Sequence, residues 1–360
     1  MRHGHDLRTL GLVCAVLLLA GCQTQVTDPT TAPLTTTQPP AVETTAAIPT
    51  NTDAIDLDQE PNQGGYPYRV EVSPDGSQVV VFSSEPNMVR VYDIGSGEQI
   101  RAFENQDLHW ARGEALSSDW SLVAMVDAEG NGWVRDFESF EPLSAQLPDC
   151  TTPKAFSPEG SLLVLSGGDD PECRGRVIEW ASGTEVLDLG GRYIHDAVFN
   201  PGGGEAGRYL TIVANPSADS ETTVSEIYDM SSHTLMSDTG LDQGVRLAFD
   251  PTGKYLAMAN LDGTALVLDF EALVGGATGE NATVQKLLAH SEIVIDIAMN
   301  AHGLLGTSSP GSDRLWDIQT GEMVADQTLD PEFWTFLAFI PDGELFYTNS
   351  HSELRTLIPS

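Results

Sequence analysis

The sequence Ser73-Pro74-Asp75-Gly76 is a tight turn between two short strands, and versions of it recur along the chain. Proline, aspartate and glycine favour such turns because proline presets one backbone angle, aspartate bonds to nearby backbone and glycine adopts a positive φ. Successive copies begin about 40–50 residues apart, a spacing typical of four-stranded propeller blades. The six further copies are Ser117-Ser118-Asp119-Trp120, Ser157-Pro158-Glu159-Gly160, Asn200-Pro201-Gly202-Gly203, Asp250-Pro251-Thr252-Gly253, Asn300-Ala301-His302-Gly303 and Ile340-Pro341-Asp342-Gly343.

The residues around the first turn show what one repeat contains. Residues 68–72 alternate between apolar and polar side chains, residues 79–82 are wholly apolar, and residues 88–94 alternate again. A Gly95-Ser96-Gly97 turn then leads to a fourth stretch, residues 99–103. Four strands joined by hairpins, recurring with each turn, predict an all-β chain that folds as a seven-bladed β-propeller.

The repeats resemble those of WD-repeat propellers over residues 66–360. The Trp-Asp pair that names the family stands intact at Trp316-Asp317, and Tyr92-Asp93, Tyr228-Asp229 and Leu268-Asp269 are close substitutes. The resemblance implies a buried hydrogen-bond network in the sixth repeat, with His290, Ser308 and Trp316 as its members. The Asp that the family places in the adjoining turn is missing, because that turn reads Pro310-Gly311-Ser312.

The last repeat shows only three strand-like stretches, at residues 334–339, 345–348 and 353–358. An open ring would leave strand edges exposed, so the missing outer strand must come from elsewhere in the chain. Residues 53–60 alternate apolar and acidic side chains just before the first repeat. We expect this segment, through Ile55 and Leu57, to complete the last blade, so that the propeller spans residues 53–360.

Two cysteines, Cys150 and Cys173, lie within the repeats. Cys150 precedes the first strand of the third repeat, and Cys173 lies in the turn between the second and third strands of that repeat. In a propeller these two kinds of loop emerge on one face, which allows the sulfur atoms to approach bonding distance. The sequence therefore predicts a Cys150–Cys173 disulfide, and the spacing does not suit zinc.

The N-terminal region begins with an apolar run at residues 10–20 that is too short to cross a bilayer as a helix. The run ends in Leu19-Ala20-Gly21-Cys22, which resembles the lipobox of bacterial lipoproteins. The resemblance implies a signal peptide at residues 1–21, lipid on Cys22, and an extracytoplasmic protein anchored to the cell membrane or the outer membrane. Residues 22–52 are rich in Thr and Pro and predict a disordered tether, because they bury too little apolar surface to fold.

The net charge is −36, from 53 acidic and 17 basic residues. Such a charge repels phosphate backbones, so we expect no nucleic-acid partner. The sequence has no Gly-x-Ser-x-Gly elbow, no phosphate-binding loop and no His-Glu-x-x-His motif. The acidic turn at residues 127–131 is explained by turn geometry rather than by calcium. No catalytic residue, cofactor or metal site is assigned from the sequence.

These features favour a lipid-anchored propeller that acts as a monomeric protein-binding scaffold, without catalysis, through the loops on its faces. Exposed aromatic side chains at His109-Trp110 and Phe333-Trp334 are candidate contacts for an unknown protein partner. Two alternatives remain. Some seven-bladed propellers are enzymes of the lactonase or quinoprotein type, and some lipoproteins bind solutes for a transporter. Bound metal, cofactor absorbance or ligand-dependent stabilisation would favour one of these alternatives.

Overall fold

A computed structural model describes the greater part of the repeat region, and all described residues belong to one compact unit, residues 49–360. The signal peptide, Cys22, Leu57 and the loops containing His109-Trp110 and Phe333-Trp334 lie outside the described residues. The described residues are 55–56, 66–84, 88–104, 113–127, 130–167, 173–202, 206–217, 220, 222–329, 335–340, 345–348 and 353–357.

The described residues form seven antiparallel sheets, which we number in chain order. Sheet 1 contains β2 (Tyr66–Val72), β3 (Gln78–Ser84), β4 (Met88–Asp93) and β5 (Gln99–Glu104). Sheet 2 contains β6 (Glu114–Leu116), β7 (Leu122–Val126) and β8 (Gly132–Asp136). Sheet 3 contains β9 (Thr152–Phe156), β10 (Leu162–Ser166), β11 (Gly175–Glu179) and β12 (Thr184–Gly190).

The second half of the chain continues the pattern. Sheet 4 contains β13 (Ile194–Phe199), β14 (Tyr209–Ala214), β15 (Val224–Asp229) and β16 (Thr234–Asp238). Sheet 5 contains β17 (Gly244–Phe249), β18 (Tyr255–Asn260), β19 (Ala265–Asp269) and β20 (Thr283–Leu287), with the short helices α1 (Phe270–Val274) and α2 (Gly279–Ala282) before β20. Sheet 6 contains β21 (Asp296–Met299), β22 (Leu304–Ser309), β23 (Ser312–Asp317) and β24 (Met323–Thr328). Sheet 7 contains β25 (Leu337–Phe339), β26 (Leu345–Thr348), β27 (Glu353–Leu357) and β1 (Ile55–Asp56).

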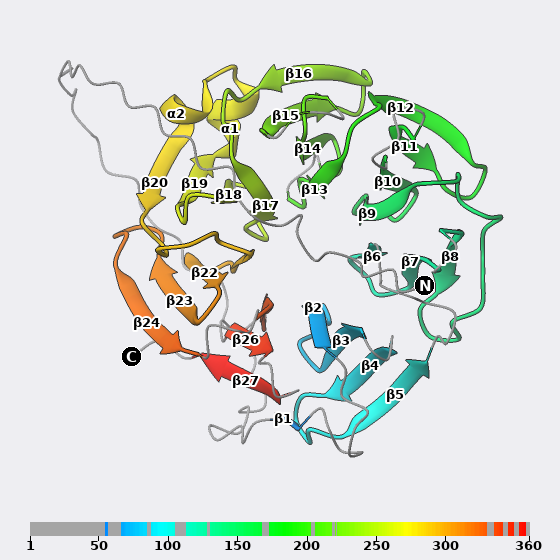
Figure 1. The fold of residues 1–360 in the computed structure, drawn as a ribbon, viewed down its shortest axis with the longest axis horizontal. Coiled ribbons are helices and arrows are strands. Elements are labelled where there is room, and N and C mark those ends of the chain that lie inside the picture. Colours follow the sequence, from blue (N-terminus) through cyan, green and yellow to red (C-terminus); the bar gives the residue numbers. More distant parts are fainter. Residues whose placement is uncertain are drawn as a thin grey trace, which may run out of the picture. The chain divides into compact units, whose positions relative to one another are not determined.

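The sheets lie side by side around a ring, as an all-β propeller (Figure 1). The first strand of each repeat is innermost, and these inner strands contact one another from β6 through β9, β13, β17, β21 and β25 to β2. Because the strands of each sheet are antiparallel, the connections between sheets and the turns between second and third strands emerge on the same side. We call this side the connecting face, and the opposite side, which carries the Ser-Pro-Asp-Gly turns, the turn face.

The prediction of seven complete blades is wrong, because only six of the sheets have four strands. Sheet 2 ends at β8, and the segment after it makes a single isolated bridge, between Arg135 and Pro142. Pro142 is not what ends the ladder, because Leu143 directs its N–H toward β8 and the N–H that Pro142 lacks would face the open edge. The segment is held instead by separate backbone bonds, from Leu143 N to Val134 O (2.8 Å) and from Leu147 N to Gly132 O (2.7 Å).

The strand β1 lies at the outer edge of sheet 7, the position expected for residues 53–60. Its two residues pair with β27 in antiparallel register, Ile55 opposite Leu354 and Asp56 opposite Glu353. The sheet therefore has the order β1-β27-β26-β25, with strands from the two ends of the propeller region in one ladder. This arrangement joins the beginning of the ring to its end.

The core lies between neighbouring sheets and is densest at their second strands. All six residues of β14 are buried, and residues 79–82 of β3 are almost completely inaccessible. A second strand has neighbouring sheets packed on both of its faces, which is why these strands are apolar without alternation. The outer strands are more exposed, as in β16, where four of the five residues are exposed.

The recurring turns work as their composition suggests. In the first turn the Ser73 hydroxyl donates to Asp75, whose carboxylate also accepts the Ser77 N–H at 3.0 Å. Gly76 closes the turn with a φ of 72°, a conformation that glycine adopts without steric cost. The second turn keeps the same geometry with Trp120 at a φ of 60°, and its ring packs edge-on against Phe137.

Candidate functional site

Six inner strands each contribute a charged side chain that interacts with a neighbouring inner strand, and β2 carries in addition Glu71, which bonds to Arg69. In ring order the signs alternate, so that three cations and three anions give a set with no net charge. Glu114 is buried and the others are half-buried. The six residues are Arg69 (β2), Glu114 (β6), Lys154 (β9), Asp196 (β13), Arg246 (β17) and Asp296 (β21). We call them the inner charged ring.

Five of these side chains hydrogen-bond to the backbone of the next sheet. The cations donate: Arg69 Nη1 to Glu114 O (2.7 Å), Lys154 Nζ to His195 O (3.4 Å) and Arg246 Nε to Ile295 O (3.4 Å). The anions accept: Asp196 Oδ2 from Leu247 N (2.8 Å) and Asp296 Oδ2 from Leu337 N (2.8 Å). Each bond crosses a seam, by which we mean the contact between two neighbouring sheets. The inner charged ring thus ties one inner strand to the next.

The charges of the ring also influence one another's ionisation. Burial raises the pKa of Glu114, and the cations Arg69, Lys154 and Arg246 oppose that shift. Burial alone would lower the pKa of Arg69, but Glu71 and Glu114 raise it above its ordinary value. Arg69 bonds to Glu71 through Nη2 (2.8 Å) and lies 3.6 Å from a Glu114 oxygen. The opposite charges therefore offset part of the cost of removing Glu114 and Arg69 from water.

Next to Lys154 of the inner charged ring lie Tyr193, just before β13, and His195, the second residue of β13. The Lys154 ammonium lies 5.0 Å from the centre of the Tyr193 ring, and Tyr193 packs edge-on against His195. His195 Nε2 lies 2.8 Å from the Asn215 amide oxygen. Burial lowers the pKa of His195, and the Asn215 bond only partly offsets it. His195 is thus a neutral, satisfied side chain near neutral pH.

The sequence did not predict the inner charged ring as a set, although a signal for it exists. Arg69, Asp196, Arg246 and Asp296 each stand four residues before the first residue of a recurring turn, and Glu114 and Lys154 stand three before theirs. Aligning the repeats on their turns would have brought these positions together. Their contacts could not be read from the sequence, because each one joins residues about 40–50 positions apart through the repeat geometry.

A buried network in sheet 6 has two of the three members that the WD-repeat resemblance implies. Trp316 Nε1 donates to Thr307 Oγ1 (2.9 Å), and His290 Nε2 lies 2.9 Å from the same oxygen. His290 Nδ1 lies 2.8 Å from Ser312 Oγ, so Ser312 occupies the place of the missing Asp. Burial, with help from Arg314, lowers the pKa of His290 to about 4. The histidine is therefore neutral at pH 7 and joins β22 to β23 without a charge.

The assignment of Ser308 to this network is wrong by one position, because Thr307 takes its place. Successive residues of a strand point to opposite faces of the sheet. Thr307 faces sheet 5 with His290 and Trp316, whereas Ser308 faces sheet 7 and donates to Thr335 O at 3.0 Å. Both hydroxyl residues are completely buried, so composition and hydropathy could not tell them apart.

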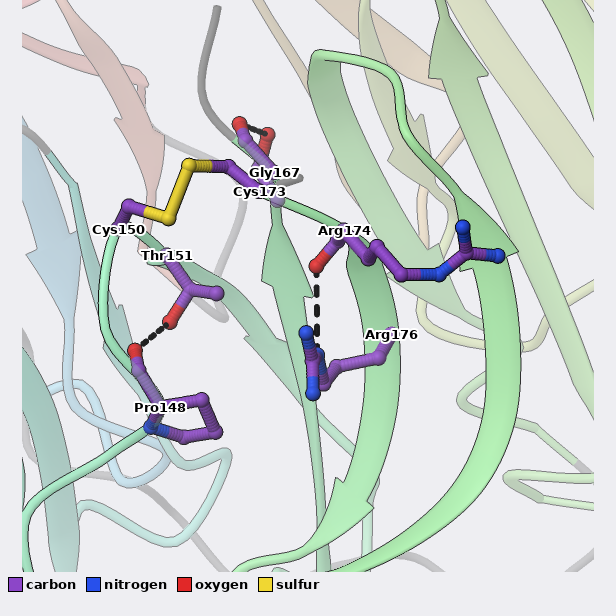
Figure 2. Close-up of a disulfide and its surroundings, with 8 residues drawn as sticks. Pro148, Cys150, Thr151, Gly167, Cys173, Arg174 and Arg176 are labelled. Atoms are coloured by element: carbon purple, nitrogen blue, oxygen red, sulfur yellow. Dashed lines mark hydrogen bonds between the residues drawn. A yellow bond between two sulfur atoms is a disulfide. The ribbon is translucent and has the colours of Figure 1, made fainter. Parts of the chain in front are cut away.

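Cys150 and Cys173 form a disulfide on the connecting face, with their Cα atoms 5.6 Å apart (Figure 2). Cys150 follows the irregular end of sheet 2, and Cys173 lies just before β11 of sheet 3. Next to the bridge, Thr151 Oγ1 donates to Pro148 O at 2.7 Å. The bond therefore fixes the connection into sheet 3 at the point where sheet 2 lacks its fourth strand.

The connecting face also exposes two large apolar side chains on ordered loops. Leu288 is 79% exposed at the end of β20, and Leu261 is 43% exposed in the turn after β18. The two loops are bonded to each other through the backbone, from His290 N to Gly263 O (2.9 Å) and from Val294 N to Asn260 O (3.1 Å). These side chains are thus held on a rigid frame although most of their surface is open to solvent.

Comparison of the chain with models of known protein families gave no match, and no curated protein sequence proved similar to it. Among the described residues, no three His, Cys, Asp or Glu side chains are placed so that they could hold a metal ion together. No helix within the described ranges is both long enough and apolar enough to cross a membrane.

Proposed function

We propose that this protein is a lipid-anchored, extracytoplasmic propeller whose connecting face binds another protein. In this proposal sheet 2 serves as a seventh, incomplete blade, so that the ring is seven-bladed and WD-repeat-like. The signal peptide would direct export, lipid on Cys22 would anchor the chain in the membrane, and the tether of residues 22–52 would let the ring extend from the membrane surface. The protein would act as a scaffold, and we assign it no catalysis.

The observation that carries the scaffold proposal is the pair of exposed leucines on the connecting face. Leu288 and Leu261 stand on loops that backbone bonds hold in place. Loops whose backbones are already held lose little conformational entropy when a partner covers them, and the two leucines offer apolar surface to such a partner. The inner charged ring supports the same proposal, because its side chains bond to neighbouring strands and so stiffen the platform.

Cross-linking in living cells tests the partner. We expect one near-stoichiometric protein to be cross-linked to the full-length chain, and Leu288→Asp to weaken the cross-link at least about tenfold, since a buried charge costs more than a lost contact. Ile100→Asp is the matched control, because Ile100 is 45% exposed but lies on the outer strand β5. Equal loss with both variants, or none with either, would contradict the proposed face. Stabilisation by a small solute instead would favour the solute-binding alternative.

The lipid anchor has its own test. We expect the full-length protein to sediment with membranes and the Cys22→Ala variant to move to the soluble fraction, because the thiol that carries the lipid is gone. The measurement is cell fractionation followed by mass determination of the N-terminal peptide. Cys14→Ala is the control, since that cysteine lies within the proposed signal peptide. A Cys22→Ala protein that still sediments with membranes would refute lipid anchoring at this residue.

A further inference from the structure

The seam between sheets 6 and 7 contains a buried carboxyl group that none of the described cationic side chains faces directly. Asp313 on β23 is completely inaccessible to solvent, as are Ser308 on β22 and Thr335 at the start of sheet 7. Asp313 lies directly opposite Ser308 in the ladder, and Ser308 lies opposite Asp296 of β21. Side chains opposite one another project from the same face of a sheet, so this polar row faces sheet 7.

Three close oxygen–oxygen contacts link the row to Thr335. Ser308 Oγ donates to Thr335 O at 3.0 Å, Ser308 Oγ touches Thr335 Oγ1, and Thr335 Oγ1 touches Asp313 Oδ1. The contact between the two hydroxyls and the contact between Thr335 Oγ1 and Asp313 Oδ1 are short enough to need a proton between the two oxygens. The serine and threonine hydroxyls supply one proton each. If Asp313 is ionised, these two protons fill the two short contacts and leave none for the bond from Ser308 to Thr335 O.

As the contacts stand, Thr335 Oγ1 can donate to an ionised Asp313, but a third proton, on the carboxyl group of Asp313, would satisfy all three contacts at once. When that group is protonated, its O–H donates to Thr335 Oγ1, the Thr335 hydroxyl donates to Ser308 Oγ, and the Ser308 hydroxyl donates to Thr335 O. The other carboxyl oxygen, Asp313 Oδ2, has no hydrogen-bond partner. A neutral acid tolerates this better than a carboxylate, whose buried charge would be uncompensated.

The charged groups around Asp313 do not supply a counter-ion. The neighbouring Arg314 belongs to the opposite face of the strand and donates to Ala289 O. His290, also on that opposite face, is bound to Thr307 and Ser312. The strand β22 and the described residues 335–340 contain no charged side chain.

The remaining charged neighbour is another carboxylate. Asp296 faces Asp313 across Ser308, and it is itself approached by Arg246 of β17 and by Asp196 of β13. On β24 the residue opposite Asp313 is Gln327, which is uncharged. Among the described residues, Asp313 therefore meets one like charge and no opposite charge at close range.

We propose that Asp313 is protonated in the folded protein and that loss of this proton opens the seam between sheets 6 and 7, which makes closure of the ring sensitive to pH. A change of charge at this seam would affect the attachment of sheet 7, which closes the ring. Asp313 and Asp296 together hold Thr335 and the Leu337 N–H, the first residues of the sheet that β1 completes.

The direction of the pH effect follows from the burial. Burial raises the pKa of Asp313 to about 7 and that of Asp296 to about 6. The unfolded chain has an ordinary aspartate pKa of 3.8, so the folded state binds more protons between that value and about 7. The stability that the protonated Asp313 and Asp296 contribute is therefore fully present below about pH 4 and is lost as the pH rises through 6 and 7.

The test compares unfolding at a series of pH values for the wild-type chain and Asp313→Asn, whose neutral amide keeps the shape and a donor. We expect the wild-type folding equilibrium constant to fall at least about tenfold between pH 5 and pH 8. The folding equilibrium constant of Asp313→Asn should change clearly less with pH over the same range. Asp326→Asn is the matched control, because Asp326 is an exposed carboxylate on β24 of the same sheet. The stability of Asp326→Asn should change with pH as steeply as that of the wild type.

A second readout uses the unmodified protein and does not depend on the variant's folding. We expect hydrogen-exchange protection of the Leu337 amide, relative to that of Ile212 in the all-buried β14, to decrease as the pH rises from about 5 to about 8. A constant ratio, or a slope in Asp313→Asn equal to that of the wild type, would overturn the proposal.

Discussion

Deletion of residues 53–60 is expected to lower the melting temperature of the propeller by about 5–10 °C. The deletion removes β1, and with it the backbone pairing of Ile55 with Leu354 and of Asp56 with Glu353. The edge of β27 would then face solvent, and the two ends of the ring would no longer share a sheet. Each lost hydrogen bond costs about 1 kcal/mol, and the loosened sheet 7 adds to that cost. Differential scanning calorimetry of the mature chain measures the effect.

The control for this experiment removes the same length of chain from the proposed tether. Deletion of residues 35–42 leaves β1 and all seven sheets intact, so we expect the melting temperature to stay within about 1 °C of the wild type. If both deletions melt alike, residues 53–60 do not close the ring. If the loss is restored by adding a peptide of residues 53–60, strand pairing is its direct cause.

The ring itself was predictable because a turn can be recognised from a few residues. The bond to the Asp75 carboxylate and the positive φ of Gly76 both lie within a few neighbouring residues. Each copy of the turn therefore predicts a hairpin from local sequence alone. Seven copies then fix the number of sheets. The number of strands in a sheet depends on weaker signals, and the segment after β8 makes only an isolated bridge where the other sheets have an outer strand.

The buried networks were less predictable, because they depend on which face of a strand a residue occupies. Thr307 and Ser308 are adjacent hydroxyl residues in the buried strand β22. A shift of one residue along the strand moves a side chain from the seam with sheet 5 to the seam with sheet 7. The role of Asp313 was missed for the same reason. Its burial comes from the packing of Leu315 against Leu337 of the next sheet, and no local pattern around residue 313 reveals that contact.

Replacement of both Cys150 and Cys173 by serine is expected to destabilise the protein by about 3 kcal/mol. The bridge closes a loop with a sequence separation of 23, and a crosslink of that span restricts the unfolded chain by about this amount in the chain-entropy description. The bridge also stabilises the folded state directly, because of how sheet 2 ends. The last segment of this sheet is held by isolated backbone bonds rather than by a ladder, so the bridge is what secures the connection into sheet 3.

The same reasoning separates the effect of the covalent bond from that of changing two side chains. Adding a reductant should destabilise the wild type to the level of the double serine variant and should leave that variant unchanged. The free energy of unfolding from urea titrations, with and without reductant, provides the comparison. If the double variant is as stable as the oxidised wild type, the bridge does not secure the connection between sheets 2 and 3. If reductant alone has no effect while the variant is destabilised, the buried Cys173 side chain matters through packing instead.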